Sequence, residues 1–127
     1  MAKESANFRQ LIWFEDLRRE DVAEVGGKNS SLGEMVSQLE PLGVKVPGGY
    51  ATTSDAFRNY VTFNNLGDTI KEAMEKLDAG KITLAVAGKT VRDAVIHGEF
   101  PEDTRDAIVE AYHELSKRAG RANVDVA

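Results

Sequence analysis

Apolar side chains recur at three- and four-residue spacing in several stretches of the chain, and each such stretch predicts an amphipathic helix. The first helix should cover about residues 29–40, where Leu32, Met35, Val36 and Leu39 define its buried face. The remaining faces comprise Phe57, Tyr60 and Val61; Ile70, Met74 and Leu77; Leu84, Ala87, Val91, Ala94 and Val95; and Ile108, Ala111, Tyr112 and Leu115. The pattern therefore predicts about five helices.

Capping residues mark the ends of these helices. Thr53 or Ser54 is placed to cap the second helix and Asp68 the third, because short polar side chains satisfy the first backbone amides. Pro101 stands where prolines stand in the first turn of a helix, so the last helix should run from there to about residue 118.

Short apolar runs rich in β-favouring residues predict strands at residues 11–14, 50–52 and 124–127. Residues 44–46 alternate like the entry to a further strand. Together the patterns predict an α/β (α+β) fold in which a few short strands pack with about five helices.

One domain of ordinary size accounts for the length. A chain of 127 residues is able to bury about two thirds of the surface that its unfolded form exposes. We therefore expect residues 1–10 to form a loose lead-in and residues 11–127 to form a single domain.

Composition narrows the class of protein. With 42% hydrophobic and 29% charged residues, and no apolar run long enough for a membrane span, the chain is predicted to be globular, without a membrane association. Its polar N-terminus lacks the apolar core of a signal peptide, which predicts a cytoplasmic protein. A net charge of −5 argues against nucleic-acid binding, which depends on lysine and arginine.

Residues for metal or nucleophilic chemistry are scarce. The chain has no cysteine, and its two histidines, His97 and His113, lie far apart in the sequence. His97 is interpreted as a cation near a helix C-terminus, and His113 lies off the apolar face of its helix. We predict no catalytic residue and no metal ligand.

Candidate binding chemistry centres on Gly26, Gly27 and Lys28. Two adjacent glycines permit positive φ and a close approach to a ligand, and the lysine follows at a helix start, where anions bind. The pattern is not a Walker A loop, which requires glycine in place of Val22 and serine or threonine in place of Asn29. The hydroxyls of Thr52 and Thr53 are further candidate ligand contacts, although capping alone explains Thr53.

Two blocks of sequence carry a family resemblance. The first comprises Val25, Gly26, Gly27, Lys28, Asn29, Ser30, Ser31, Leu32, Gly33, Glu34 and Met35, and the second Val46, Pro47, Gly48, Gly49, Tyr50, Ala51, Thr52 and Thr53, followed by Ala56 and Phe57. In order and spacing they resemble the start of the phosphoenolpyruvate synthases. The opening residues Ile12, Trp13, Phe14 and Glu15 fit this family in particular. More broadly they resemble the N-terminal ATP-grasp-type nucleotide-binding domain shared with pyruvate phosphate dikinase and rifampicin phosphotransferase. The resemblance is dense over residues 11–58 and thin beyond.

The resemblance implies an ATP-dependent phosphotransferase. Its family converts pyruvate to phosphoenolpyruvate through a phosphohistidine, with Mg²⁺ on the nucleotide and with AMP and phosphate as products. It implies that Lys28 contacts the ATP phosphates, with Gly26 and Gly27 beside it. In this family the strand expected at 124–127 leads into a segment whose arginine binds the nucleotide phosphates. The chain stops before that segment, so we expect residues 11–127 to be an incomplete ATP-grasp-like domain, the N-terminal piece of a larger enzyme. By itself this piece should be inactive and should bind no cofactor tightly.

Alternatives remain open from the sequence. Pyruvate phosphate dikinase and rifampicin phosphotransferase share the same domain, and a phosphate acceptor is not specified by a nucleotide-binding fold. A free-standing binding module without chemistry would also lack an acid–base pair and a nucleophile, as this chain does. Self-association is a further expectation, because surface that the rest of such a fold covers would be exposed.

Overall fold

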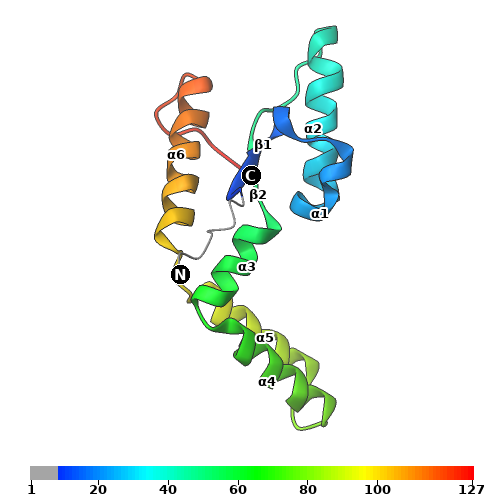
Figure 1. Ribbon diagram of the computed structural model, residues 1–127, viewed down its shortest axis with the longest axis vertical. Helices are drawn as coiled ribbons and strands as arrows, with labels where there is room; N and C mark the ends of the chain where they lie inside the picture. Colours follow the sequence, from blue (N-terminus) through cyan, green and yellow to red (C-terminus); the bar gives the residue numbers. More distant parts are fainter. Residues whose placement is uncertain (1–8) are drawn as a thin grey trace, which may run out of the picture. The chain divides into compact units, whose positions relative to one another are not determined.

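The computed structural model describes residues 9–127, so the lead-in predicted for residues 1–10 lies almost entirely outside the described residues (Figure 1). In chain order the elements are β1 (Leu11–Trp13), η1 (Phe14–Asp16), η2 (Arg19–Asp21), α1 (Val22–Val25), α2 (Gly27–Leu39), η3 (Glu40–Leu42), β2 (Tyr50–Thr52), α3 (Ser54–Phe63), α4 (Leu66–Asp78), α5 (Leu84–Ile96) and α6 (Glu102–Arg118), where η denotes a 3-10 helix. The predicted α+β class is confirmed.

Two compact units make up the described part. One contains the residues up to Phe57 together with Glu102–Ala127, and the other is Arg58–Pro101. The division falls within α3, whose first turn belongs to the first unit. The assignment of residues 11–127 to a single domain stays a prediction.

In the first unit β1 and β2 form an antiparallel pair, with Leu11 opposite Thr52, Ile12 opposite Ala51 and Trp13 opposite Tyr50. Backbone hydrogen bonds extend the pairing by one residue at each end, from Phe14 N to Gly49 O (3.0 Å) and from Thr53 N to Gln10 O (3.1 Å). The strands predicted at residues 11–14 and 50–52 are therefore confirmed, the first one residue shorter than predicted.

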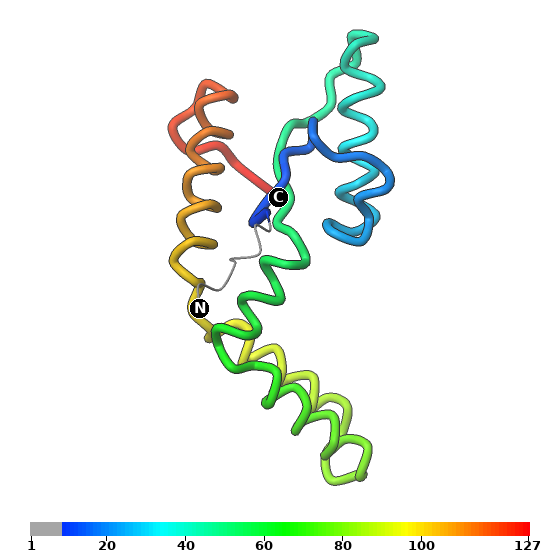
Figure 2. Tube along the Cα trace, in the orientation of Figure 1, coloured from blue at the N-terminus to red at the C-terminus, as the bar shows by residue number. Residues whose placement is uncertain are grey.

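The strand predicted at residues 124–127 is wrong, and residues 44–46 form none either. After α6 the chain turns back (Figure 2). There its backbone groups bind side chains of that helix. Val124 N donates to Ser116 Oγ (3.3 Å), and the Tyr112 hydroxyl donates to Val124 O (2.9 Å). An alternating sequence becomes a strand only where a neighbouring strand supplies the hydrogen bonds, and here α6 supplies them.

A small core lies between the sheet and the N-terminal helices, formed by Ile12, Leu17, Val25 and Ala51 with Phe14 packed against them. Burial of these side chains fixes α1 and η1 against the strands.

The buried face of α2 differs from the predicted one. Ser30, Gly33 and Val36 are buried, whereas Met35 is 40% exposed. Gly33 explains the rotation, because a Cβ there would collide with the Leu17 side chain and lie 2.9 Å from Phe14 O. The helix packs through its smallest residues, which an apolar pattern does not reveal.

Helix α6 covers the sheet in the same unit. The Tyr50 hydroxyl donates to Ile108 O (3.3 Å), and burial raises its pKa. Gln10 bonds to Asp103 (2.9 Å) and to Thr104 (2.8 Å), which ties the helix start to the residue before β1. The helix begins one residue after Pro101 and ends at Arg118, as predicted.

The second unit is helical and is built around the α4–α5 hairpin. The Tyr60 hydroxyl donates to Val95 O (2.6 Å), and its ring meets Phe100 edge-on at 5.3 Å. Asn64 Nδ2 donates to Glu99 O, and Asn64 Oδ1 accepts from Glu99 N, both at 2.8 Å. These bonds hold the residues after α5 against the last turn of α3.

Three details of this unit differ from the predictions. Met74, which was placed on the buried face of α4, is 47% exposed. α4 begins at Leu66 after Asn65, whose φ of 54° is left-handed, so Asp68 lies inside the first turn and is not the cap. There its charge still favours the helix N-terminus. Leu84, predicted to be buried, is 74% exposed because it opens α5, whereas Ala87 one turn later is buried.

No helix in residues 9–127 is long and apolar enough to cross a membrane.

Candidate functional site

Gly26 alone separates α1 from α2 (Figure 1). Its φ of 84° and ψ of 165° lie in a region that essentially only glycine adopts. Its N–H donates to Val22 O (2.8 Å) and closes α1, while its carbonyl accepts from Ser30 N (3.1 Å) and opens α2. We call Gly26, Gly27 and Lys28 the glycine turn. The backbone conformation at this position therefore requires glycine.

The N-terminus of α2 has no side-chain cap. Within the described part of the chain, the backbone N–H groups of Gly27, Lys28 and Asn29 have no hydrogen-bond partner. The first amides of a helix carry partial positive charge, because the peptide dipoles align along the axis. This end of α2 is therefore suited to bind an anion.

Lys28 is the second residue of α2, and it is exposed together with both glycines. Its ammonium group makes no ion pair or hydrogen bond with any described residue. The structure thus brings a mobile cation and three unpaired amides to one place, all contributed by adjacent residues.

Thr52 and Thr53 do not reach the glycine turn by any hydrogen bond in the described residues. Thr53 is buried, donates its hydroxyl to Arg9 O (2.6 Å) and accepts from Ala56 N (3.1 Å), so it caps α3. Thr52 is exposed at the end of β2. The junction of β2 and α3 instead touches α1, where Ser54 Oγ donates to Ala23 O (3.2 Å).

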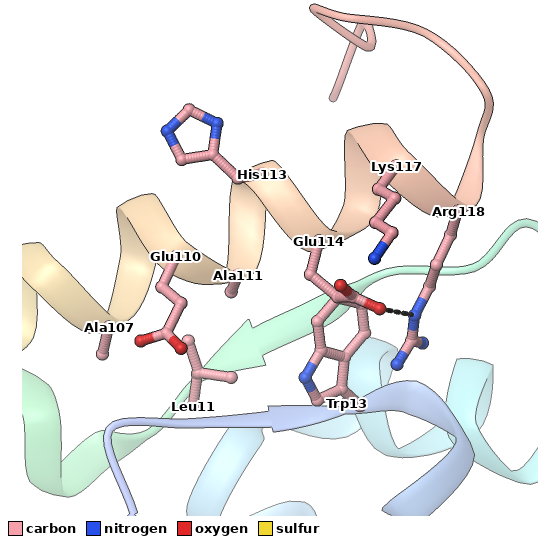
Figure 3. Close-up of a pocket in the computed structure, with 9 residues that line it drawn as sticks. All are labelled: Leu11, Trp13, Ala107, Glu110, Ala111, His113, Glu114, Lys117 and Arg118. Carbon is pink, nitrogen blue, oxygen red and sulfur yellow. Dashed lines mark hydrogen bonds and ion pairs between the residues drawn. The ribbon is translucent and has the colours of Figure 1, made fainter.

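A separate hollow of about 650 Å³ lies between β1 and α6, with Trp13 and Arg118 at one end (Figure 3). The Arg118 guanidinium lies 3.9 Å from the Trp13 ring centre and pairs with Glu15 (2.7 Å) and Glu114 (3.2 Å). Hydrogen bonding to Glu15 raises the pKa of Arg118. Lys117 also lines the hollow, but so do the carboxylates of Glu110 and Glu114, which repel an anion. The hollow is therefore a poorer anion site than the glycine turn.

Metal ligands do not gather anywhere in residues 9–127, since no group of three His, Cys, Asp or Glu side chains could hold an ion. His97 Nδ1 lies 2.7 Å from Asp93 O at the C-terminus of α5, and His113 is exposed and points away from Trp13 in Figure 3.

Comparison with known proteins gives the family. A family model described as "Pyruvate phosphate dikinase, AMP/ATP-binding domain" matches residues 22–127. The chain belongs to this family. The glycine turn lies at the start of the matched region, so the part of the chain with an uncapped helix start is inside the AMP/ATP-binding domain.

Individual relatives have one name in common. A phosphoenolpyruvate synthase from Neisseria meningitidis is 46% identical over 118 residues, which is 92% of this chain and 15% of that protein. Those from Aquifex aeolicus and Escherichia coli K12 are 40% and 42% identical over 92% and 84% of this chain, each match covering 14% of the relative. The chain thus spans about 15% of the length of the curated relatives it matches.

Sequence reasoning missed the side chains that shape the turn. Asn29 Nδ2 donates to Val25 O (2.9 Å), and Ser30 Oγ donates to Gly27 O (3.1 Å). Both residue types often bond to a nearby backbone at helix starts, and this was the only signal that could have indicated them.

Proposed function

We propose that this chain binds the phosphates of ATP at the glycine turn. The observation that carries the proposal is the uncapped N-terminus of α2 beside exposed Lys28, inside a region that matches an AMP/ATP-binding domain. The three unpaired amides would donate to phosphate oxygens, and the lysine would add a charge-assisted hydrogen bond.

Gly27 supports this proposal because the fold does not require a glycine at this position. A Cβ at Gly27 would meet only Val22 Cγ2, at 3.9 Å, which is an ordinary contact. A glycine at the first position of a helix also costs stability relative to alanine. We infer that the missing side chain leaves room for a phosphate to approach the backbone.

We further propose that the chain is the N-terminal part of an ATP-grasp-type domain in a phosphoenolpyruvate synthase. The relatives named phosphoenolpyruvate synthase support this, because they match over most of this chain. Such an enzyme would transfer phosphate from ATP to pyruvate through a phosphohistidine, releasing AMP and phosphate. Lys28 would then stabilise the charge that develops on the transferred phosphate.

Residues 9–127 contain no group of three His, Cys, Asp or Glu side chains that could hold Mg²⁺ by themselves. We propose that in the complete enzyme the ion accompanies the nucleotide phosphates, where it would neutralise their charge. Thr52 and Thr53 stay predictions as nucleotide contacts, and the engaged hydroxyl of Thr53 makes Thr52 the better candidate of the two.

The test is a titration of the ¹⁵N-labelled chain with ATP, AMP and tripolyphosphate, followed through the backbone amide signals. ATP and tripolyphosphate should shift the signals of Gly27, Lys28 and Asn29. Lys28→Ala should weaken the binding of ATP by about tenfold, as the loss of a charged hydrogen bond does. Lys45→Ala removes the same charge from an exposed position elsewhere in the first unit and should leave the affinity unchanged.

Shifts confined to another region, or equal losses in Lys28→Ala and Lys45→Ala, would contradict the site. Binding of AMP and ATP with equal affinity, without any response to tripolyphosphate, would show that the nucleoside or its α-phosphate is recognised rather than the β- and γ-phosphates.

Self-association is also part of the proposal. Large apolar side chains are exposed in both units, with Leu42, Leu84 and Ile96 each above 70% exposed. Such surface favours contact with partners. Sedimentation should show association at high protein concentration, and monomers at every concentration would rule it out.

A further inference from the structure

Every backbone carbonyl around the glycine turn has an internal donor. Val25 O accepts from Asn29 Nδ2 (2.9 Å), Gly26 O from Ser30 N (3.1 Å) and Gly27 O from Ser30 Oγ (3.1 Å). The three N–H groups that follow Gly26, those of residues 27–29, have no partner in the described part of the chain. The turn therefore offers only donors to a ligand.

The hydrogen bond from the Asn29 side chain to Val25 O is the unusual one in this arrangement. In a continuous helix its backbone N–H would reach Val25 O four residues earlier. The positive φ of Gly26 breaks that ladder, and the side-chain amide of Asn29 binds the same carbonyl instead. One side chain of α2 thus spans Gly26 and holds the last residue of α1, which is itself buried.

We propose that Asn29 is a positioning residue for phosphate binding. By fixing Val25 O, its amide holds the glycine turn in the one conformation that points the three N–H groups and Lys28 outward. The residue acts through the backbone and does not itself need to touch the phosphate with its side chain. This inference rests on the proposed phosphate site and adds the residue that holds it in shape.

Ser30 is a less suitable carrier of this role. Its hydroxyl bonds to Gly27 O within α2 itself, and the residue is 3% exposed in the packed face of that helix. Replacing it would disturb packing and the turn together. Asn29 is only half-buried, and its bond crosses from one helix to the other, so its effect on the turn is separable from packing.

The experiment compares Asn29→Ala and Asn29→Asp with Ser31→Ala. The control Ser31 is exposed and lies in the same turn of α2, and its hydroxyl makes no hydrogen bond with the described residues. Without nucleotide, ¹⁵N relaxation reports the order of Gly26 and Gly27, and amide hydrogen exchange reports that of Gly26, whose N–H is bonded to Val22 O. Val36 serves as an internal reference in α2. ATP titration of the alanine variants then reports affinity, and thermal melting reports folding.

We expect both Asn29 variants to loosen Gly26 and Gly27 while Val36 stays protected, and Ser31→Ala to resemble the unchanged chain. ATP affinity should fall about fivefold in Asn29→Ala, because one net hydrogen bond shifts a two-state turn by about that factor. The melting temperature should change little, since alanine favours the helix more than asparagine does.

Outcomes that overturn the inference differ from those that overturn the phosphate site. If Gly26 and Gly27 stay as ordered in both Asn29 variants as in the unchanged chain, Asn29 does not hold the turn. If the turn loosens but the ATP affinity of Asn29→Ala equals that of Ser31→Ala, the positioning role is wrong. If the unchanged chain does not respond to ATP at all, the proposed function fails and the positioning role fails with it, while the relaxation data still show whether Asn29 orders the turn.

Discussion

Helices α2 and α3 begin in opposite ways. At the start of α3, the buried Thr53 accepts from Ala56 N (3.1 Å) with its own hydroxyl and donates to Arg9 O (2.6 Å). At the start of α2, an exposed glycine stands in the cap position, and no side chain of residues 9–127 bonds to the first amides. A helix end that is capped internally stabilises the fold, whereas an uncapped one keeps its donors available for a ligand. We therefore expect the start of α2 to bind a ligand and the start of α3 to stabilise the fold.

Lys28 gives the largest expected effect. In the complete enzyme, Lys28→Ala should lower single-turnover phosphate transfer from labelled ATP by roughly two to three orders of magnitude, since loss of one such contact costs about 2–4 kcal/mol of transition-state stabilisation. Thermal melting should barely change, because the side chain is exposed and unpaired with the described residues.

Lys28→Arg should restore little of this activity, because a planar fork replaces a compact ammonium group at a tight turn. Transfer near the normal rate by a well-folded Lys28→Ala enzyme would make Lys28 an ordinary surface lysine.

Gly26 comes next, and its effect should fall on stability. Gly26→Ala would force a Cβ into a backbone region that only glycine adopts, at a cost of about 1–3 kcal/mol in the free energy of unfolding. No atom lies within 4 Å of the added Cβ, so the loss would come from the backbone alone. Urea denaturation measures it, with Gly67→Ala as the control.

Gly67 also has open space around it but no positive φ, so its alanine variant should unfold at the same urea concentration or a slightly higher one. Equal midpoints for Gly26→Ala and Gly67→Ala would show that the φ of Gly26 is not a constraint.

Thr53 tests the other half of the comparison. Thr53→Ala removes the cap of α3 and should lower the free energy of unfolding by about 1–2 kcal/mol, whereas Thr52→Ala, at an exposed position, should have little effect. Thr53→Ala should leave the ATP affinity measured by titration calorimetry unchanged, whereas a loss of affinity in Thr52→Ala would support Thr52 as a nucleotide contact. A loss of affinity in a folded Thr53→Ala chain would mean that its hydroxyl contacts the ligand after all.

The helices were predictable because their apolar spacing is local. The face with Tyr60 and Val61, and the proline before α6, each predict a helix from a few neighbouring residues. Phe57 was placed on the same face but is 56% exposed, and the neighbouring Ala56 is buried instead. Helix α1 was missed, since four residues are too few for any periodicity. The strand expected at 124–127 failed for the opposite reason, because strand formation depends on a distant partner that no local pattern contains.

At the site, the residue types were predictable from the sequence, but the hydrogen bonds that hold them in place were not. Two glycines and a lysine before a helix are visible as a motif, and the structure shows why Gly26 must be glycine. The engagement of Thr53 depends on Arg9 O, which is far away in the sequence. The bond from Asn29 to Val25 depends on the backbone conformation of Gly26, and the motif alone does not specify this conformation.

Gly27 gives the smallest change in stability and the sharpest separation of fold from binding. Gly27→Ala places a methyl group at ordinary distance from Val22 Cγ2 (3.9 Å) at a helical position. Because alanine lowers the entropy of the unfolded chain and favours the helix, the variant should be more stable by about 0.4–1 kcal/mol. The same methyl group would stand beside the unpaired amides, so ATP should bind more weakly. Urea denaturation and titration calorimetry on one preparation measure both effects. If Gly27→Ala gains stability and keeps its ATP affinity, the phosphate does not approach the backbone here, and Lys28 alone would have to account for binding at α2.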